Sequence, residues 1–422
     1  MKFSVVVPVC NVEKYLAECL DSILKQNISS LEVVCVNDGS TDSSLSILRE
    51  FAKSDSRVVV VDKPNSGYGD SVNIGINRAS GDYIGIVESD DIVVDGIFQK
   101  MLTIAKNTGV DFVKGTFNFY QAESCTRNLH PNFMNLPCDK IISVNEYPEL
   151  FFTAPSIWSG VYKRSFLDEN KIRFLPTPGA SYQDTSFAFK VWATAKSVYL
   201  LSDPVIDYRQ DSSGSSSNIS KKVFNIFNET KEMERFIKEN ELERFYPEFV
   251  KTKFISYAWT LARLNENDKR KFFLRWIPEL TSEFEKGYFV KKYWDDYNWN
   301  YIHQLVFNPQ QSIENVCSST PILAPAFSKI EILSKITPVY IYGAGKYGQI
   351  ALKKLKVHGV NTSAFVVSSR DDNPGSVDGI PVIQLDEIDK DGIIFIGLSE
   401  KYKMEVLKLL KDRWLFNNVF EI

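Results

Sequence analysis

The feature that most constrains this chain is the alternation of short apolar runs with amphipathic segments over its first 120 residues. The apolar runs are typical of strands buried in a parallel sheet, and they cover residues 3–9, 31–36, 58–61, 83–87 and 111–119. Segments with helical spacing lie between them, at residues 12–24, 40–51, 70–79 and 96–107. Asn11 is placed to cap the first of these helices. Strands that alternate with helices predict right-handed βαβ units and hence a doubly wound α/β sheet.

The length of the chain predicts more than one domain. Its 422 residues exceed the size at which a single core stops growing, so two or three domains are expected. We predict an α/β domain over residues 1–220, whose second half is less periodic, and an aromatic-rich helical segment over residues 221–320. A linker-like stretch lies at residues 308–325. Residues 336–422 then restart strand, Gly-rich turn and helix as a small half-Rossmann α/β domain.

Charge and composition exclude several classes of function. The net charge is −4 at pH 7, so no overall basic field would recruit nucleic acid. No stretch reaches 18 apolar residues, and the apolar start at residues 3–9 is too short for a signal peptide. A cytoplasmic protein, soluble or peripheral at the inner face of the membrane, is expected. Six cysteines without a CxxC pair predict reduced thiols, and three scattered histidines argue against a zinc site.

Polar residues follow each of the first four predicted strands. They occupy residues 8–11, 37–42, 62–67 and 88–91. Each cluster alone is compatible with turn chemistry or a solvated acidic turn, but their joint occurrence is more specific. Because ligands of an open parallel sheet bind beyond the carboxyl ends of its strands, these residues predict a binding crevice at one edge of the sheet.

The most acidic cluster, Glu88-Ser89-Asp90-Asp91, is the predicted metal site. Glu88 and Asp90 are two residues apart, so on an extended backbone their side chains point to the same side. Carboxylate oxygens suit Mg²⁺ or Mn²⁺, which proteins usually hold with one or two carboxylates and phosphate oxygens. One of these divalent cations is therefore the expected cofactor.

Four motifs carry a resemblance to a known family. They are VVVPVCNVEKYLAECLDSILKQ, VNDGSTDSS, NSGYGDSVNIGI and GDYIGIVESDD. Together they resemble the nucleotide-sugar-binding half of family 2 inverting glycosyltransferases, which have a GT-A-type, Rossmann-like fold. The likeness is close over residues 1–120. It continues more loosely to about residue 215, through PSIWSGVYKRSF, SYQDTSFAFKVWA and YRQDSSGSS.

The resemblance implies roles for individual residues. The donor site would contain Pro8, Val9, Asn11, Glu13, Asp38, Asn65, Gly67, Glu88 and Ser89. Among these, Asp38 would accept a hydrogen bond from the base, Glu13 would lie at the rim of the nucleotide pocket, and Glu88 would lie near the donor ribose or sugar. Asp90 would be the chief metal ligand, with Asp91 in support.

The resemblance also implies a catalytic base. In the family this is an Asp or Glu in an acidic pair that opens a helix below the acceptor site. The matching stretch here is YQDTSF at residues 182–187, which makes Asp184 the candidate. Asp184 could equally cap the helix that carries Phe187 and Trp192, and one carboxylate could serve both purposes.

The chain departs from the family pattern at three positions. Glu88 stands where the metal motif usually has Asp, and Gln183 stands where the later pair usually has Glu. Both keep a side-chain oxygen. Val72 stands where an Arg usually precedes Asn73, which removes a charge that could have met the diphosphate. Three basic residues could replace it, namely Lys63, Arg78 and Arg209.

A second Gly-rich turn lies at residues 343–348, after an apolar strand and before a helix, as a dinucleotide fingerprint requires. The next strand ends in Ser368-Ser369 without the acidic residue that would hold a ribose. The segment resembles the small Rossmann-like domains that accompany sugar acyltransferases and bacterial glycosyltransferases. Three uses stay open: a structural or partner-docking role, which we favour, nucleotide or phosphate binding, and NAD-dependent catalysis.

The aromatic helical segment has two interpretations. Its tryptophans are Trp259, Trp276, Trp294 and Trp299. They could form a face at a membrane interface, where Trp is common. We favour core packing or contacts in a homodimer.

The resemblance thus implies an inverting, metal-dependent glycosyltransferase that moves a sugar from a nucleotide donor, UDP by default, to a glycan or lipid-linked saccharide in bacterial-type surface polysaccharide synthesis. In the expected single displacement, Asp184 takes the proton of the acceptor hydroxyl. Two alternatives remain. One is an NAD-dependent sugar-modifying enzyme that uses residues 343–348. The other is a GT-A scaffold without catalysis, to which the departures at Glu88 and Val72 point.

Overall fold

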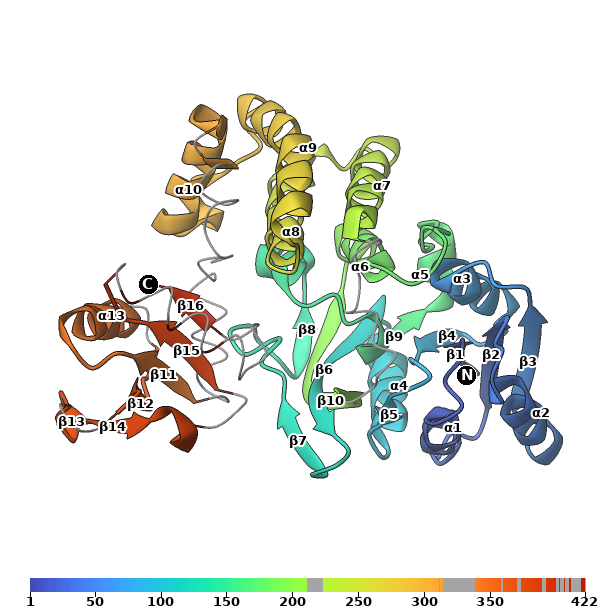
Figure 1. The fold of residues 1–422 in the computed structure, drawn as a ribbon. Coiled ribbons are helices and arrows are strands. Elements are labelled where there is room, and N and C mark those ends of the chain that lie inside the picture. The colour runs from blue at the N-terminus through green and yellow to red at the C-terminus, as the bar shows by residue number, and fades with distance from the viewer. Residues whose placement is uncertain are drawn as a thin grey trace. The chain divides into compact units, whose positions relative to one another are not determined.

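The computed structural model describes residues 1–210, 223–310, 312–313, 338–357, 360–369, 373–388 and 392–399, with residues 402, 406, 410 and 419–421 (Figure 1). The chain forms two compact units. Unit 1 contains Met1–Thr260 and Thr281–Tyr293, and unit 2 contains Leu261–Leu280 and Trp294–Ile422. The predicted α/β fold class is confirmed, because both units have parallel strands joined through helices.

The N-terminal half of unit 1 has the predicted strand–helix alternation. Its strands are β1 (Phe3–Val9), β2 (Leu31–Asp38), β3 (Val58–Lys63) and β4 (Tyr83–Ile86), and its helices are α1 (Leu16–Leu24), α2 (Ser44–Ser54), α3 (Tyr68–Arg78) and α4 (Ile97–Thr108). The strands pair in parallel in the order β3-β2-β1-β4. Their carboxyl ends therefore lie along one edge of the sheet, where the polar clusters follow.

The other half of this sheet is mixed. Strand β9 (Gly160–Lys163) lies between β4 and β6 (Phe112–Gln121) and is antiparallel to both. Strand β10 (Val198–Arg209) runs parallel to β6. The short antiparallel strands are β5 (Ile92–Val93), β7 (Thr126–Leu129) and β8 (Lys140–Ile142). Residues 112–121 thus do not pair with β4, because a later strand occupies that position.

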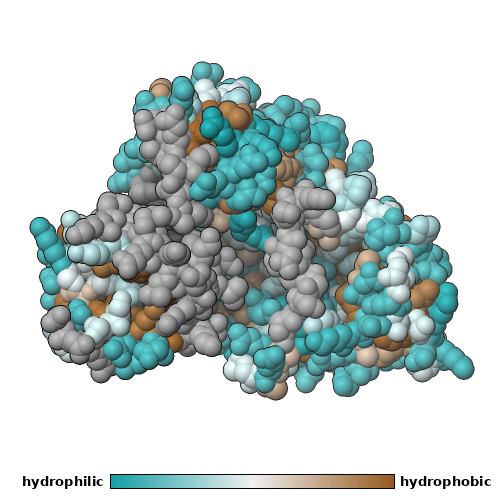
Figure 2. Space-filling view, viewed as in Figure 1, coloured by the Kyte–Doolittle hydropathy of each residue, from teal (hydrophilic) through white to brown (hydrophobic). Residues whose placement is uncertain are grey.

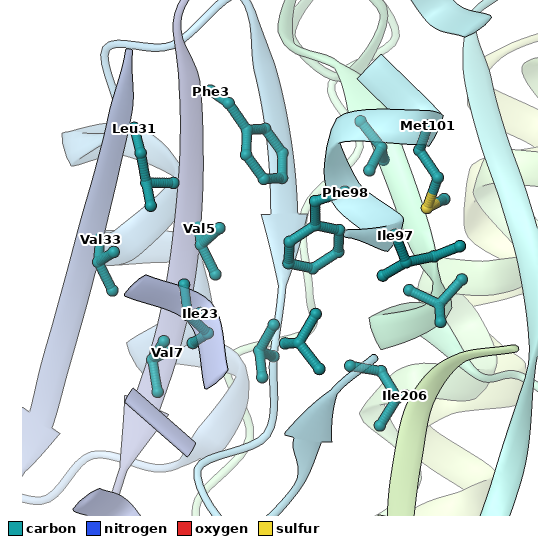
Figure 3. Packing of buried hydrophobic residues seen from close by; sticks show 14 of the residues in the cluster. Phe3, Val5, Val7, Ile23, Leu31, Val33, Ile97, Phe98, Met101 and Ile206 are labelled. Carbon is teal, nitrogen blue, oxygen red and sulfur yellow. The ribbon is translucent and has the colours of Figure 1, made fainter. Parts of the chain in front are cut away.

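The core of unit 1 lies between the sheet and the helices α1 and α4. Val5 and Val7 of β1 are fully buried beside Ile23 of α1, and Figure 3 shows these side chains pointing toward one another. The rings of Phe3 and Phe98 meet edge to face, with centroids 5.2 Å apart. The near-continuous apolar strands seen in the sequence are therefore buried, as strands of a parallel sheet are expected to be.

The predicted helix cap at Asn11 is wrong. Helix α1 begins at Leu16, and its N-cap residue, Tyr15, makes no side-chain capping bond. Asn11 has φ = 54°, and its Oδ1 accepts a hydrogen bond from the amide of Thr41 at 2.7 Å. Asn tolerates this left-handed conformation, which here binds the chain after β1 to the loop after β2.

Short elements and four longer helices complete unit 1 and continue beyond it. The short ones are η1 (Val144–Glu146), η2 (Pro148–Phe152), η3 (Ile157–Ser159), α5 (Arg164–Glu169), η4 (Val223–Asn225), η5 (Glu243–Phe245) and η6 (Lys291–Tyr293). The longer helices of unit 1 are α6 (Gln183–Thr194), α7 (Ile226–Glu239) and α8 (Tyr246–Leu261), while α9 (Glu266–Glu285) has residues in both units. A buried ion pair of 2.7 Å between Lys190 and Glu232 joins α6 to α7.

Unit 2 contains α10 (Asp296–Phe307) and a second sheet, in the order β13-β14-β12-β11-β15-β16. The strands are β11 (Val339–Tyr342), β12 (Ala364–Val367), β13 (Ser376–Val377), β14 (Ile380–Gln384), β15 (Ile393–Ile396) and β16 (Val419–Glu421), with η7 (Leu385–Glu387) after β14. The Gly-rich turn leads from β11 into α13 (Lys346–Val357), as predicted. The predicted linker at 308–325 lies largely outside the described residues.

The tryptophans of the helical segment differ in exposure. Trp276 and Trp294 are buried, whereas Trp259 is 46% exposed. Among the described residues, no helix is long and apolar enough to cross a membrane. On the face drawn in Figure 2, hydrophilic residues predominate and apolar ones form small scattered patches.

Candidate active site

The acidic loop after β4 is bound to the end of β10. The backbone amide of Asp91 donates to the carbonyl of Glu88 at 3.1 Å, which closes a tight turn. Asp91 is 1% exposed, and its Oδ1 accepts the amide of Arg209 at 2.9 Å. The predicted support residue Asp91 therefore holds the loop in place from within, and Ser89 beside it is also buried.

Arg209 is the basic residue that the fold brings to this loop. Its Nε donates to the carbonyl of Asp90 at 2.9 Å, and its guanidinium pairs with Glu18 at 2.6 Å. The other two candidates lie elsewhere. Lys63 pairs with Asp38 and Asp70, and Arg78 is exposed in the last turn of α3. Of the three, Arg209 is thus the one positioned beside the acidic loop.

Electrostatic coupling shows that Asp184 lies near the acidic loop. The pKa of Glu88 is raised to about 8, chiefly by burial and also by the negative charges of Asp90 and Asp184. The hydroxyl of Tyr68 donates to Glu88 Oε1 at 2.5 Å, and this hydrogen bond lowers the pKa of Glu88. Burial also raises the pKa of Asp184 to about 6, against hydrogen bonds from Thr185. Carboxylates almost 100 residues apart in sequence therefore share one site.

Asp184 lies in the first turn of α6, as predicted, and the N-cap position belongs to Tyr182. Tyr182 has φ = 61°, a left-handed conformation that turns the chain sharply into the helix. The side chain of Gln183 is buried and donates to Thr177 Oγ1 at 2.9 Å and to the carbonyl of Gly179 at 3.1 Å. Gln183 thus builds the preceding loop, which leaves Asp184 as the carboxylate at this helix end.

Tyr208 is a site residue that the sequence reasoning missed. Burial raises the pKa of its phenol, and so do the charges of the four surrounding carboxylates, Asp91, Asp90, Glu88 and Asp184. Its ring stacks on Trp158, with centroids 5.2 Å apart and planes 11° from parallel. Both aromatics lie in or beside the looser motifs PSIWSG and YRQD, which is the signal that could have identified them.

The residues assigned to the nucleotide pocket lie at the ends of β1, β2 and β3. Pro8 and Val9 are buried in β1. Asn11 and Glu13 bind the loop after β2, Glu13 through a bond of 2.7 Å from the amide of Ser43. These contacts shape the chain around the strand ends. The predicted contacts with a nucleotide remain predictions.

Asp38 organises the loop after β3. Its carboxylate is 4% exposed and accepts the amides of Ser66 at 2.8 Å and Gly67 at 3.0 Å, besides its ion pair with Lys63. Asn65 donates its side-chain amide to the carbonyl of Asp38 at 2.9 Å. The predicted hydrogen bond from Asp38 to a base must therefore compete with three donors of the protein itself.

Gly67 connects the nucleotide side to the acidic side. It has φ = 108°, and a Cβ there would approach the carbonyl of Thr177 to 2.6 Å, so only glycine fits. The next residue, Tyr68, starts α3 and bonds to Glu88. The two groups of predicted site residues are thus adjoining parts of one edge of the sheet.

A divalent cation fits this chemistry only with help from a ligand. Within the described parts of the chain, no group of three or more His, Cys, Asp or Glu side chains could hold a metal ion. The half-buried carboxylate of Asp90 has no hydrogen bond or ion pair to any described side chain, and Asp91 Oδ2 is buried without a partner among those residues. Hard oxygen atoms left open in this way suit Mg²⁺ or Mn²⁺ that also takes phosphate oxygens.

Parts of the chain are similar to known glycosyltransferases. The sequence family described as "Glycosyl transferase family 2" matches residues 4–169. An uncharacterized glycosyltransferase of Bacillus subtilis, EpsJ, is 30% identical over 214 residues, which cover 49% of this chain and 61% of EpsJ. The poly(ribitol-phosphate) beta-glucosyltransferase of Bacillus spizizenii is 31% identical over 207 residues, 48% of this chain and 31% of the relative.

One more curated relative and one solved structure complete the comparison. Glycosyltransferase GlyA of Streptococcus pneumoniae is 31% identical over 219 residues, 49% of this chain and 30% of GlyA. The chain thus spans less than two thirds of the length of each of these three relatives. Among solved structures, S. aureus TarS 1–349 in complex with UDP-GlcNAc has 18% identity and a TM-score of 0.48, over 76% of this chain and 93% of TarS 1–349.

Proposed function

This chain contains a glycosyl transferase family 2 domain, as its motifs predicted, and we propose that it transfers a sugar from a nucleotide donor to a saccharide acceptor. UDP is the proposed nucleotide, and inversion at the anomeric carbon is the proposed stereochemistry. The observation that carries the proposal is the gathering of Glu88, Asp90 and Asp184 at the carboxyl edge of the parallel strands. Glu88 is repelled by the charges of the other two acids, and half-buried carboxylates placed in this way are costly unless the site uses them.

Asp184 is the proposed general base. Its pKa of about 6 leaves it largely ionised at neutral pH, yet close enough to that pH to accept a proton efficiently. In the proposed step, the acceptor hydroxyl oxygen forms a bond to the anomeric carbon as its proton passes to Asp184. The bond from the anomeric carbon to the diphosphate oxygen breaks with its electron pair, so the nucleoside diphosphate leaves.

Asp90 and Glu88 would hold the donor side. Asp90 is the proposed ligand of a Mg²⁺ or Mn²⁺ ion, which when bound would neutralise charge on the leaving diphosphate. Asp91 keeps the loop in register with Arg209. Glu88, which accepts a hydrogen bond from Tyr68, would form a further hydrogen bond with a hydroxyl group of the nucleotide sugar. Arg209 is held close behind the loop, where its positive charge moderates the repulsion among the acids.

The proposed acceptor is a glycan or lipid-linked saccharide of a bacterial surface polymer. Support comes from the names of relatives, which include a poly(ribitol-phosphate) beta-glucosyltransferase and the minor teichoic acid biosynthesis protein GgaB of Bacillus subtilis. Such an acceptor would place the protein in the cytoplasm, at the inner face of the membrane. The residues of unit 2 have no part in the proposed step.

A donor panel tests the proposal directly. Purified protein would be incubated with UDP-, GDP- and dTDP-sugars in the presence of Mg²⁺, Mn²⁺ or a chelator, and nucleoside diphosphate release would be measured. We expect slow release from a UDP-sugar that requires the cation. Absence of release and of UDP binding under every condition would favour a non-catalytic scaffold. Turnover of NAD(H) with a sugar substrate would instead favour the dehydrogenase alternative.

A further inference from the structure

Unit 1 has a cavity whose lining residues do not include the acidic loop. It is a cavity of about 490 Å³, a size typical of small-molecule pockets. Its walls come from η1, η2, η5, η6 and the first turn of α8. No residue assigned to the donor or base lines it.

The cavity wall contains a buried carboxylate, one of whose two oxygens has no donor among the described residues. Glu248 is 7% exposed, and its Oε1 accepts the hydroxyl of Tyr293 at 2.6 Å. Its Oε2 is buried and has no hydrogen-bond partner among the described residues. Buried carboxylate oxygens in native proteins are nearly always satisfied. Because the terminal torsion of Glu is broad, a small rotation would present this acceptor to a donor in the cavity.

The remaining lining combines donors, acceptors and aromatic rings. Two exposed carboxylates, Glu146 and Glu149, and two cations, Arg244 and Lys292, also line it. The aromatic surface comes from Phe151, Phe245 and Tyr293. Arg244 lies over the ring of Phe245 at 4.6 Å, and Lys292 lies over that of Tyr293 at 4.9 Å, so both cations are already placed on aromatic faces.

The walls are fixed from neighbouring elements, so the cavity is present before any ligand binds. Thr252 of α8 donates to the carbonyl of Phe151 at 3.1 Å, and Lys251 donates to the carbonyl of Tyr293. The ring of Phe152 meets that of Tyr293 at 5.7 Å. A preformed pocket loses little conformational entropy on binding.

We infer that this cavity binds an uncharged sugar unit, through hydroxyls that donate to the carboxylates and ring faces that rest on the aromatic side chains. An anion is disfavoured because three carboxylates outnumber two cations. A purely apolar ligand would leave Glu248 Oε2 without a donor. A structural metal is not supported, since the described residues contain no group that could hold one. Sugars supply hydroxyl donors and apolar faces together.

The position of the cavity relates it to the acceptor side. Phe151 packs on Phe189 of α6, with centroids 5.3 Å apart, and α6 carries Asp184 in its first turn. Asp184 and Phe189 are five residues apart, about 140° around the helix, so the cavity lies on another side of α6 from the base. If the proposed function holds, the cavity would retain an acceptor unit remote from the reacting hydroxyl.

Ligand-observed saturation-transfer NMR on the full chain tests the inference, with cellobiose and N,N′-diacetylchitobiose as neutral probes. Line broadening in phosphorus NMR reports binding of inorganic phosphate, the anionic probe. We expect at least one disaccharide to bind, and Glu248→Gln to weaken it about fivefold, because one hydrogen bond is lost. Glu149 is exposed and lines the cavity, so Glu149→Gln should also weaken disaccharide binding. The matched control Glu243→Gln, an exposed acid of η5 outside the lining, should not.

Three outcomes would overturn the inference: no disaccharide binding, equal binding to wild type and both lining variants, or binding of phosphate instead. UDP affinity measured by calorimetry on the same samples separates this inference from the proposed function. Disaccharide binding without UDP binding would contradict only the glycosyltransferase proposal. UDP binding that is unchanged by Glu248→Gln, with no disaccharide binding in the wild type, would contradict only the saccharide pocket.

Discussion

The parallel strands of the two units use the same strand–turn–helix connection but present different chemistry at the strand ends. In unit 1 the ends of β2 and β4 lead to Asp38 and to the loop Glu88–Asp91. In unit 2 the ends of β11 and β15 lead to Gly343 and Gly397. The architecture alone therefore does not identify a catalytic site, because function depends on the side chains that follow each strand.

The loops are also held by different means. In unit 1 the carboxylate of Asp38 organises its neighbouring loop through the amides of Ser66 and Gly67. In unit 2 backbone packs directly on backbone, and a Cβ on Gly348 would approach the carbonyl of Gly343 to 1.8 Å. The carboxylate of Asp38 thus holds the loop in unit 1, whereas the turn in unit 2 depends on glycines that have no side chain. Removing an acid should therefore damage chemistry in unit 1, whereas adding a methyl group should damage stability in unit 2.

The largest expected effect is at Asp184. Asp184→Asn keeps the shape of the helix start but cannot accept the acceptor proton, so the transfer rate should fall by about 10²–10⁴-fold. UDP affinity should stay near the wild-type value, because the proposed role of Asp184 is toward the acceptor. Transfer kinetics beside UDP calorimetry provide the measurement. Near-normal transfer would remove Asp184 from the mechanism.

The pH profile gives an independent check on the same residue. Below its pKa of about 6, Asp184 holds a proton and cannot act as a base. The value of kcat/KM should therefore fall about tenfold per pH unit below that point. A profile that stays flat down to pH 5 would contradict the assignment, provided the protein remains folded by circular dichroism.

A loss of donor affinity is expected at Asp90. Asp90→Ala should abolish the part of UDP affinity that depends on Mg²⁺ or Mn²⁺, because its open carboxylate is the proposed ligand. Calorimetry with UDP and Mn²⁺ measures this, and a chelator should reproduce the loss in wild-type protein. Asp95→Ala, at an exposed acid five residues on, is the control that should bind normally. Equal affinity in the Asp90 variant and the wild type would exclude this ligand.

In unit 2 the expected effect is on stability alone. Gly348→Ala should destabilise this unit by about 1–3 kcal/mol, as overpacking usually does. Gly345→Ala is the control, since a Cβ there meets nothing within 4 Å. Scanning calorimetry would report both variants, and neither should change donor hydrolysis at temperatures where unit 1 stays folded. Lost hydrolysis in Gly348→Ala alone would show that unit 2 contributes to the reaction.

The smallest expected effect separates structural acids of unit 1 from catalytic ones. Glu229 is fully buried, accepts the hydroxyl of Ser186 at 2.5 Å, and has a pKa raised by burial to about 8. The native state therefore keeps this proton at pH values where the unfolded chain, with an ordinary pKa near 4.5, has lost it. Stability should fall as the pH rises from about 4.5 to 8.

Glu229→Gln removes that fall and retains an acceptor for Ser186. Between pH 5 and pH 8, the free energy of unfolding of the variant should rise relative to that of wild type by on the order of 1–2 kcal/mol. The upper limit for a pKa shift of this size over that range is about 4 kcal/mol. Urea unfolding at the two pH values gives the comparison. Glu239→Gln, an exposed acid of the same helix, should show no pH-dependent gain. If the stability of Glu229→Gln depended on pH as strongly as that of wild type, Glu229 would not be the group that causes this dependence.

Local pattern was enough to predict much of this protein. The four strands β1 to β4 lie within two residues of the predicted apolar runs, because a buried strand is encoded by contiguous residues. The family followed from motifs within the first 120 residues, and the acids were correctly expected at the strand ends. Even the Gly-rich turn of unit 2 was predicted, since its glycines are needed by the local backbone.

Tertiary structure decided what depends on residues distant in sequence. The insertion of β9 between β4 and β6 cannot be read from either neighbour, because strand pairing is set by packing over the whole sheet. Asp38 proved to be engaged by Lys63, Ser66 and Gly67. Tyr208 entered the acidic site only through the pairing of β10 with β6 and β5. Periodicity specifies which residues are buried, whereas the burial and charge that tune a site arise only when separate elements meet.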